Sequence, residues 1–394
     1  METIRAHHWR SYTDTYKGCE FECQYCLYKG PGEYGRHVRP VEVSIPARSD
    51  LGIVDIGTTT DPYQPMEAEQ KLTRSILEAA LAERIPLFVL TRGNLVLRDA
   101  DLLRELAAAG LVEVCVSIIT LNEEVTTRIE PNAPRPIERL RVAEQLAAQD
   151  IPVAFHVAPL IPGLDTPENL AAMGRTLAET CGSHVFSAML GARKPYWAPF
   201  YQGMDAVADK CGSFETFQQA YPRDFDFSRD AADTCDFEHA LPALTPLRDG
   251  VTAGGAVYVS ENYPFLTTGA LEKGIYRWKL PTVYDMASFI EERGTVTQWD
   301  DFVTWYRGYQ PSDRLVALVR SLWDSGELFL GTRLAKQDEG YVISETLLLP
   351  ARHTLVAKRT PVAHTTASTP PAQAAAGAQR SAAHSSAATA TRAL

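Results

Sequence analysis

The chain has 394 residues, of which 45% are hydrophobic and 22% are charged, and its formal net charge is −11 at pH 7. That length suits one large domain and a smaller one, and the hydrophobic fraction is ample for a buried core. The net negative charge argues against a protein that binds along nucleic acid through its overall electrostatic potential. No stretch approaches the roughly 20 apolar residues that a membrane span needs.

The N-terminal segment and the cysteines together indicate a reducing compartment. Residues 1–18 contain no apolar stretch of the kind that a secretory signal requires. The sequence has seven cysteines, an odd number, and three of them fall within eight positions. Without a secretion signal, that pattern favours metal ligation over a disulfide framework. We therefore expect a cytoplasmic protein with a metal site.

Residues 51–190 alternate short apolar strands with amphipathic helices. The pattern predicts strands at 51–57, 85–91, 111–119, 151–159 and 184–190, and helices at 67–83, 98–110, 135–149 and 166–182. Near-continuous apolar strands that alternate with helices indicate an α/β protein with a parallel sheet covered by helices. An earlier strand near residues 11–18 brings the count to about six units, which predicts a partial (β/α)6 barrel. A doubly wound open sheet is the competing topology.

The pattern changes after about residue 210. Between residues 281 and 346 we expect three helices followed by two short strands, an order that resembles a small winged-helix unit. The segment from about residue 365 onward is mostly Ala, Thr, Ser and Gln, too polar to form a core. The predicted parts are a barrel at 1–210, a mainly helical accessory or substrate-capping domain at 211–350, and a largely disordered tail at 351–394.

The segment GCEFECQYC, residues 18–26, holds Cys19, Cys23 and Cys26 in the spacing C-x3-C-x2-C. Three thiolates can bind three irons of a cubane cluster and leave the fourth iron without a protein ligand. That open iron can then be chelated by a substrate or a cofactor. A tetrahedral zinc site would need a fourth Cys or His, and His37 keeps zinc open as an alternative.

The cysteine motif, with Tyr25 as the aromatic residue before its last cysteine, resembles the signature of the radical S-adenosylmethionine (SAM) superfamily. Further segments resemble, in the same order, the group related to spore photoproduct lyase: GTTTDPYQPME, LTRGNLVLRDADLL, VSIITLNEE, RIEPNAPRPIERL and HVAPLIPGLD. The resemblance covers roughly residues 10–190. It implies two cofactors, a 4Fe–4S cluster and SAM, and an enzyme that cleaves SAM reductively to a 5′-deoxyadenosyl radical.

The resemblance also implies roles for individual residues. The three cysteines would ligate the cluster, and the cofactor contacts would be Tyr25, Thr60, Asp61, Arg92, Ser117 and Ala158. Thr60 and Asp61 match a Ser-Asp pair that holds the amino group of SAM, and Arg92 matches a lysine that meets its carboxylate. A guanidinium can do the same bidentately. Ser117 matches a serine that reaches the cofactor, while Tyr25 and the Ala158 backbone would flank the adenine.

Each of these residues also has a simpler interpretation. Asp61 precedes a proline and suits a turn, Arg92 suits a surface cation, and Ser117 suits a polar position within a strand. Their order behind the cysteine motif favours the cofactor roles. Glu130 matches another motif of the group, but the sequence assigns it no role.

One position departs from the group. Its namesake repairs DNA with a cysteine two residues before the Ser-Asp pair, and the residue here is Thr58. Because a hydroxyl O–H is too strong to donate a hydrogen atom to a carbon radical, we do not expect spore DNA repair. Cys115 lies two residues before Ser117 in the same predicted strand, so the two side chains point to the same face. Cys115 is therefore a candidate hydrogen-atom donor, although a small buried core residue is the simpler interpretation. Cys181, Cys211 and Cys235 do not by themselves predict a second cluster.

The preferred substrate is a small anion, for example a nucleotide or nucleoside intermediate of nucleoside-antibiotic biosynthesis, undergoing carbon–carbon bond formation or rearrangement. Cations expected near the barrel mouth carry this preference: Arg36, His37, Arg39, Arg128, Arg135, Arg193 and Lys194. Solvated surface charges are the alternative. Flavodoxin or ferredoxin is the expected electron donor, with neither membrane nor nucleic acid as a partner.

Two other functions stay open on sequence alone. One is a radical enzyme that modifies a peptide or a nucleic acid. The other is a DNA-binding regulator in which an iron–sulfur cluster senses redox state. The candidate recognition helix, residues 312–325, carries two arginines against two aspartates, a poor composition for binding phosphates.

Overall fold

The computed structural model describes eleven stretches of the chain: 10–28, 38–40, 53–181, 183–227, 234–263, 266–268, 283–308, 311, 313–326, 328–329 and 332–344. All of them belong to one unit, Met1–Lys358, whereas the second unit, Arg359–Leu394, lies outside the described residues. The predicted tail at 351–394 therefore lies outside them as well. None of the described helices is long and apolar enough to cross a membrane.

The large sheet contains seven parallel strands in chain order. They are β1 (Arg10–Thr13), β4 (Ile53–Ile56), β5 (Leu87–Thr91), β6 (Val112–Ser117), β7 (Val153–Leu160), β8 (His184–Met189) and β9 (Val257–Ser260). A doubly wound sheet reverses its strand order partway through the chain. This order never reverses, so the α/β fold is the partial barrel and not the competing topology. Two shorter strands, β2 (Tyr16–Lys17) and β3 (Arg39–Pro40), pair separately.

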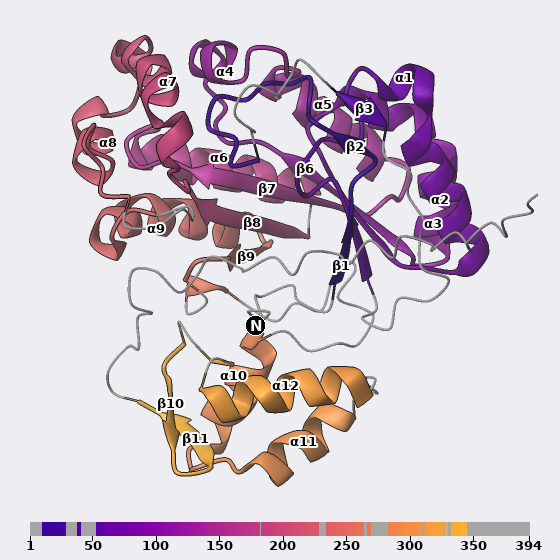
Figure 1. Ribbon diagram of the computed structural model, residues 1–394, viewed down its shortest axis with the longest axis vertical. Helices are drawn as coiled ribbons and strands as arrows, with labels where there is room; N and C mark the ends of the chain where they lie inside the picture. The colour runs from indigo at the N-terminus through magenta and orange to yellow at the C-terminus, as the bar shows by residue number, and fades with distance from the viewer. Residues whose placement is uncertain are drawn as a thin grey trace, which may run out of the picture. The chain divides into compact units, whose positions relative to one another are not determined.

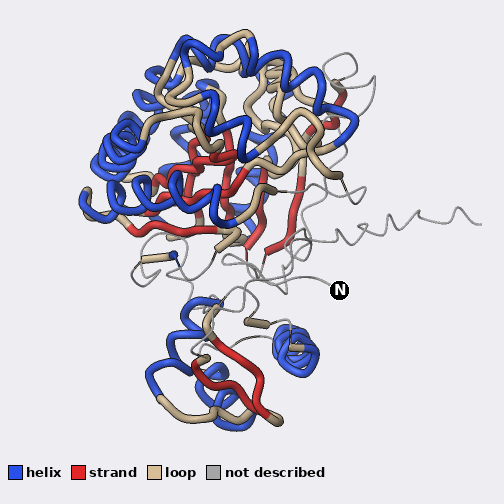
Figure 2. The backbone as a smooth tube through the Cα atoms, turned by 90° about the vertical axis from the view of Figure 1, so that its left-hand side faces the viewer, coloured by secondary structure: helices blue, strands red, loops and turns tan. Residues whose placement is uncertain are grey.

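Helices follow the strands and cover one face of the sheet (Figures 1 and 2). Their bounds are α1 (Glu67–Gln70), α2 (Leu72–Glu83), α3 (Ala100–Ala108), α4 (Glu123–Ile129), α5 (Pro136–Ala147), α6 (Pro167–Cys181), α7 (Lys194–Asp205), α8 (Phe214–Ala220) and α9 (Phe237–Ala253), with 3-10 turns at Asn94–Asp99 and Ala208–Lys210. Helix α4 begins at Asn122, whose side chain accepts from the backbone N–H groups of Glu124 and Val125.

The two faces of the sheet bury different side chains, because alternate residues of a strand point to opposite sides. Residues such as Val54, Leu87 and Val114 join the helices in the main core. The opposite, inner face carries a smaller cluster made of Ile53, Phe88, Cys115, Ala154, Phe186 and Val259. The predicted inward orientation of Cys115 thus agrees with the structure, and its side chain is fully buried there.

The sheet continues past the predicted domain boundary at residue 210. Strand β9 pairs with β8, and α9 packs directly against α6. Glycines allow the close approach of these two helices: a Cβ on Gly250 would overlap the Ala171 carbonyl oxygen, and one on Gly174 would lie 2.6 Å from the Leu247 oxygen. The structure therefore places residues 237–260 in the same sheet and core as residues 53–189.

The C-terminal region has the predicted order of three helices and two strands, and a hydrophobic core of its own. Its elements are α10 (Val283–Arg293), α11 (Trp299–Arg307), α12 (Asp313–Ser325), β10 (Leu334–Gln337) and β11 (Gly340–Ile343). The two strands form an antiparallel hairpin, and Thr297 bridges to Tyr341 beside it. Trp323 anchors the hairpin by donating from its indole N–H to the Glu339 carbonyl at 2.9 Å.

Candidate cluster and cofactor site

The cysteine triad lies in the loop after β2. Cys19 and Cys23 are buried, Cys26 is half-buried, and the Cys26 N–H donates to the Cys23 carbonyl at 3.2 Å. Burial raises the pKa of Cys19 to about 11 and the pKa of Cys23 to about 12. The surroundings alone therefore keep these thiols protonated, and binding to iron would release their protons.

The spacing of the three sulfurs bears on the choice between zinc and a cluster. Among the described residues, one group of three potential ligands has all its ligand atoms within 4.8 Å of one another, and it is Asp236, Glu238 and His239. The cysteine triad is not gathered that closely, as ligands of a single tetrahedral ion would be. Three thiolates can each hold a different iron of a cubane, so the donor set suits a cluster. His37, the fourth ligand of the zinc alternative, lies outside the described residues.

Neighbouring segments fix the cluster loop by backbone contacts. The Gln24 N–H donates to the Ile129 carbonyl at 2.9 Å, and its side-chain amide donates to the Arg128 carbonyl at 3.0 Å. On the other side, the Glu20 N–H donates to Oε1 of Gln64 at 2.9 Å. The loop is thus held between the end of α4 and the segment that follows β4.

Asp61 joins the end of β4 to the end of β5. Its Oδ1 accepts from the Tyr63 N–H at 2.9 Å and from the Thr91 hydroxyl at 2.6 Å, and its Oδ2 accepts from the Arg92 N–H at 2.7 Å. Burial raises the pKa of Asp61, although these three hydrogen bonds oppose the rise. Both carboxylate oxygens accept hydrogen bonds from the chain, so Asp61 fixes the position of the Arg92 backbone. The neighbouring Thr60 hydroxyl donates to the Tyr16 carbonyl at 3.1 Å.

The Arg92 guanidinium is the point where the predicted residues meet. Its Nη1 lies 2.9 Å from Cys23 Sγ and 2.7 Å from the Tyr25 hydroxyl, and its Nη2 lies 3.3 Å from Ser117 Oγ. These contacts bring together the cluster loop, the end of β5 and the end of β6. The side chain is 18% exposed, so Arg92 is not a surface cation.

Glu130 has a structural role that the sequence did not assign. This fully buried carboxylate accepts from Arg92 Nη1 at 2.8 Å, from Arg139 Nη2 at 2.6 Å and from the Tyr25 hydroxyl. Burial alone would raise the pKa of Glu130, but the guanidiniums of Arg139 and Arg92 outweigh it and lower the pKa below its usual value. Arg139 lies on α5 and also donates to the Ser117 carbonyl at 3.1 Å. Sequence gave no signal for Arg139 beyond its place in the IEPNAPRPIERL segment.

Two predicted residues lie on the inner face of the sheet. Cys115 is packed in the apolar cluster of that face, and Ala158, which precedes a cis proline, is half-buried near the end of β7. Their functional roles, adenine contact for Ala158 and hydrogen donation for Cys115, stay predictions. The same face carries a polar pair, His156 and Glu261, with Nε2 and Oε1 3.0 Å apart.

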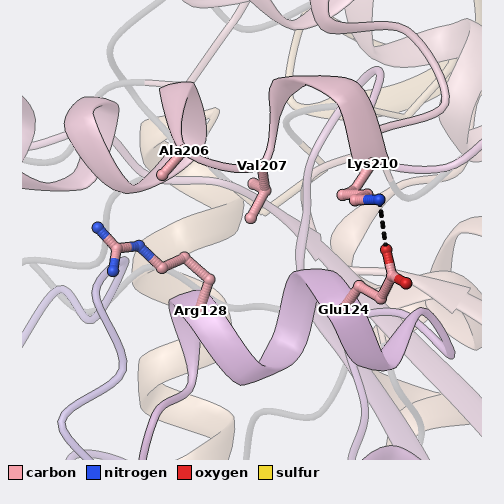
Figure 3. A pocket seen from close by; sticks show the side chains of 5 residues that line it. All are labelled: Glu124, Arg128, Ala206, Val207 and Lys210. Carbon is pink, nitrogen blue, oxygen red and sulfur yellow. Dashed lines mark ion pairs between the residues drawn. The ribbon is translucent and has the colours of Figure 1, made fainter.

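Two cavities adjoin α4, and one of them also adjoins the cluster loop. The larger, about 480 Å³, is lined by Glu124 and Arg128 of α4 and by Ala206, Val207 and Lys210, and an ion pair of 3.0 Å joins Lys210 to Glu124 (Figure 3). The smaller, about 280 Å³, is lined by Gln24, Arg128, Tyr196, Pro199, Gln202 and Gly203. Gln24 directly follows Cys23, so the smaller cavity lies against the cluster loop.

The structure distinguishes among the cations that sequence placed at the barrel mouth. Arg128 is exposed and lines both cavities. Arg193 instead supports the cluster loop by donating to the Leu27 carbonyl at 2.6 Å. Arg135 pairs with Glu123 at 3.4 Å on the surface. The remaining four are either exposed, as Arg39 and Lys194 are, or outside the described residues, as Arg36 and His37 are.

Comparisons with known proteins agree with this site. Residues 14–173 match the family model described as the radical SAM superfamily. Over 201 residues the chain is 31% identical to the uncharacterized protein Rv2578c of Mycobacterium tuberculosis, an alignment that covers 45% of this chain and 59% of that protein. It is also 26% identical to the radical SAM Nalpha-GlyT isomerase of Pseudomonas phage M6, covering 48% of this chain and 40% of that protein. A structure of spore photoproduct lyase with dinucleoside spore photoproduct aligns at TM-score 0.44 and 16% identity, covering 62% of this chain and 74% of that one.

The sheet order, the cysteine loop and the family match define an α/β radical SAM domain. Residues 14–173 match the radical SAM superfamily model, and the cofactors of that family are a 4Fe–4S cluster and SAM. The resemblance of the cysteine motif to the signature of this superfamily is thereby confirmed. The alignment spans about 59% of the length of the mycobacterial relative.

Proposed function

We propose that this protein uses Cys19, Cys23 and Cys26 to hold the cluster and the residues around Arg92 to bind SAM. The observation that carries the proposal is the meeting of Cys23, Tyr25 and Ser117 on one partly buried guanidinium. Separate segments of the chain supply these side chains, and they converge beside the cluster loop at the C-terminal ends of the strands, where β/α folds build active sites. When bound, the cluster and SAM supply one-electron reductive cleavage to a 5′-deoxyadenosyl radical.

The residues of the chain would bind and orient the cofactor. Arg92 supplies a positive charge for a carboxylate, and Asp61 fixes the backbone from which Arg92 projects. Thr60, Tyr25 and Ala158 keep their proposed contacts with the amino group and the adenine. Burial of Cys19, Cys23 and Tyr25 excludes water from the reaction, which protects a radical from side reactions.

The proposed substrate is a small anion, such as a nucleotide or a nucleoside derivative. Its support is the exposed Arg128, which lines both cavities, including the smaller one beside the cluster loop. A few local cations can bind a compact anion, whereas the net charge of −11 disfavours binding of a long polyanion. Thr58 replaces the thiol donor of the group's namesake, which favours rearrangement or carbon–carbon bond formation, and the name of the phage relative is that of an isomerase. We further propose a flavodoxin or ferredoxin as electron donor and a reducing cytoplasm as the setting.

The regulator alternative is disfavoured by the geometry of α12. Its Arg320 pairs with Asp324 at 2.8 Å and lies 4.9 Å from the centre of the Trp299 ring. A guanidinium engaged in this way offers little to a DNA phosphate. An enzyme that modifies a peptide or a nucleic acid remains the second candidate, and the substrate screen below distinguishes it.

The test is a substrate screen with anaerobically reconstituted, reduced protein. Nucleotides, free nucleosides, a short peptide and duplex DNA are each added with SAM, and 5′-deoxyadenosine is measured above the background without substrate. The proposal expects stimulation by a nucleotide or nucleoside, and a weaker response from the variant Arg128→Gln. Stimulation by the peptide or by duplex DNA alone would overturn the substrate class while leaving the radical chemistry intact.

A further inference from the structure

The buried group Arg92, Glu130 and Arg139 carries an arrangement that cofactor binding does not require. A guanidinium that only met the carboxylate of SAM would have no need to touch a cluster cysteine. Arg92 nevertheless places Nη1 2.9 Å from Cys23 Sγ, within the reach of an N–H···S hydrogen bond. We propose that Glu130 positions Arg92 as a donor to the Cys23 sulfur and that this contact raises the reduction potential of the cluster. The inference rests on the proposed function, because it needs a cluster at these cysteines.

The guanidinium is fixed in this place from several directions. The Arg92 backbone N–H donates to Asp61 at 2.7 Å, and the two hydrogens of Nη1 are shared among Cys23 Sγ at 2.9 Å, the Tyr25 hydroxyl at 2.7 Å and Glu130 at 2.8 Å. Glu130 is itself held by Arg139 at 2.6 Å, with side-chain exposures of 0% for Glu130 and 1% for Arg139. Because these contacts already hold the guanidinium in place, little further side-chain entropy is lost when it donates to the sulfur. Glu130 touches no cysteine, so it is a positioning residue.

Charge gives the contact its effect on the potential. Glu130 neutralises one of its two arginines, so the three side chains carry a net charge of about +1 in a buried place beside Cys23. A cluster bound by three thiolates becomes more negative when it accepts an electron. A nearby positive charge and a hydrogen bond to a ligand sulfur both stabilise the reduced form. The contact should therefore make the cluster easier to reduce.

The readout is the midpoint potential of the reconstituted cluster without SAM, measured by redox titration with electron paramagnetic resonance. Iron and sulfide are counted first for each protein. Arg92→Gln removes the charge and, because glutamine is two bonds shorter, withdraws the donor from the sulfur; we expect about a ten-fold fall in the ratio of reduced to oxidised cluster at a fixed potential, equivalent to a downward shift of about 59 mV. Leaving SAM out separates this role from any contact with the SAM carboxylate, which could not alter the potential of a cluster that has no cofactor bound.

Glu130→Gln tests the positioning role through the sign of the shift. Loss of a negative charge near the cluster would by itself raise the potential. If Glu130 holds Arg92 against Cys23, releasing that guanidinium lowers the potential instead. Glu67→Gln is the matched control, because Glu67 is also a buried carboxylate that accepts from an arginine, Arg98 at 2.6 Å, and from a tyrosine hydroxyl. It should leave the potential unchanged.

The outcomes separate this inference from the function on which it rests. Wild-type protein that binds no iron and sulfide overturns the proposed function itself. A loaded cluster whose potential is the same in wild type and Arg92→Gln overturns the inference alone, and so does a rise in Glu130→Gln. If Arg92→Gln fails to load a cluster, Arg92→Met replaces it, because methionine has neither a charge nor an N–H donor: a lower potential supports the donor role, and an unchanged one overturns it.

Discussion

Replacing Asp165 with asparagine should stabilise the protein at neutral pH and leave its stability unchanged in acid. Asp165 lies between β7 and α6 and accepts from the Thr120 hydroxyl at 2.9 Å. Burial raises the pKa of Asp165 from 3.8 to about 6, and the bond from Thr120 only partly opposes the rise. An asparagine can keep the contact with Thr120 through its own amide oxygen while carrying no charge to bury.

The sign and size follow from the pKa difference between the folded and unfolded chain. Because the folded pKa is the higher one, the folded state is favoured below pH 4, and this advantage is lost as the pH rises through about 6. Each pKa unit corresponds to 1.36 kcal/mol, so ionised Asp165 costs up to about 3 kcal/mol above that pH. Solvent reaches part of this carboxyl, which reduces the expected gain for Asp165→Asn to about 2 kcal/mol.

The assay is urea-induced unfolding of wild type and Asp165→Asn, followed by circular dichroism at pH 4, 5, 6, 7 and 8. The difference in unfolding free energy should be near zero at pH 4, should increase through pH 5 and 6, and should level off by pH 7. Thr120→Val serves as a companion variant, since removing the hydroxyl should raise the pKa of Asp165 further and destabilise the protein mainly above pH 6. A difference between wild type and Asp165→Asn that is independent of pH would refute this reasoning.

Three further predictions concern cofactor binding and stability. Arg92→Ala should weaken SAM binding about ten- to a hundred-fold, the effect of losing a charged contact of roughly 1.5–3 kcal/mol, and Asp61→Ala should weaken it by releasing the Arg92 backbone, both measured by equilibrium dialysis; unchanged affinity would contradict these roles. Gly57→Ala should lower the unfolding free energy by roughly 1–3 kcal/mol, because Gly57 has φ +91° and a Cβ there would overlap the Leu90 carbonyl oxygen; a stability equal to wild type would show that β4 and β5 adjust freely. Deleting residues 366–394 should leave activity and melting temperature unchanged, because their composition forms no core; a drop of several degrees would contradict that.

The hydrophobic pattern of the sequence was sufficient to predict the strands of the large sheet as far as β8. Strands buried on both faces are continuously apolar, and here they alternate with regular helices. The pattern failed at α9 and β9. Helix α9 contains Pro242 and Pro246, which interrupt the usual helical signal, and β9 has only four residues. The close packing of α9 on α6 depends on Gly174 and Gly250, and no local pattern indicates which glycines will face each other.

The candidate site shows a similar division. The spacing of the cysteines predicts the metal site, because ligands of one cluster can lie in one short loop. The contact of Arg92 with Cys23 spans 69 positions and that of Tyr25 with Glu130 spans 105, so only the fold could reveal them. Sequence assigned Asp61 and Arg92 to different groups of SAM, and the engagement of Asp61 by three donors of the chain could not be predicted from one sequence.

The most direct test of the account is the formation of 5′-deoxyadenosine by the full chain. Protein reconstituted with iron and sulfide without oxygen, then reduced and given SAM, should bind about four irons and release 5′-deoxyadenosine. The variants Cys19→Ala, Cys23→Ala and Cys26→Ala should release none while keeping the circular dichroism of the wild type, and Cys235→Ala, a buried cysteine outside the loop, is the matched control that should remain active. Stoichiometric zinc without iron or sulfide, or equal product from the loop variants and the wild type, would contradict the assignment of this site.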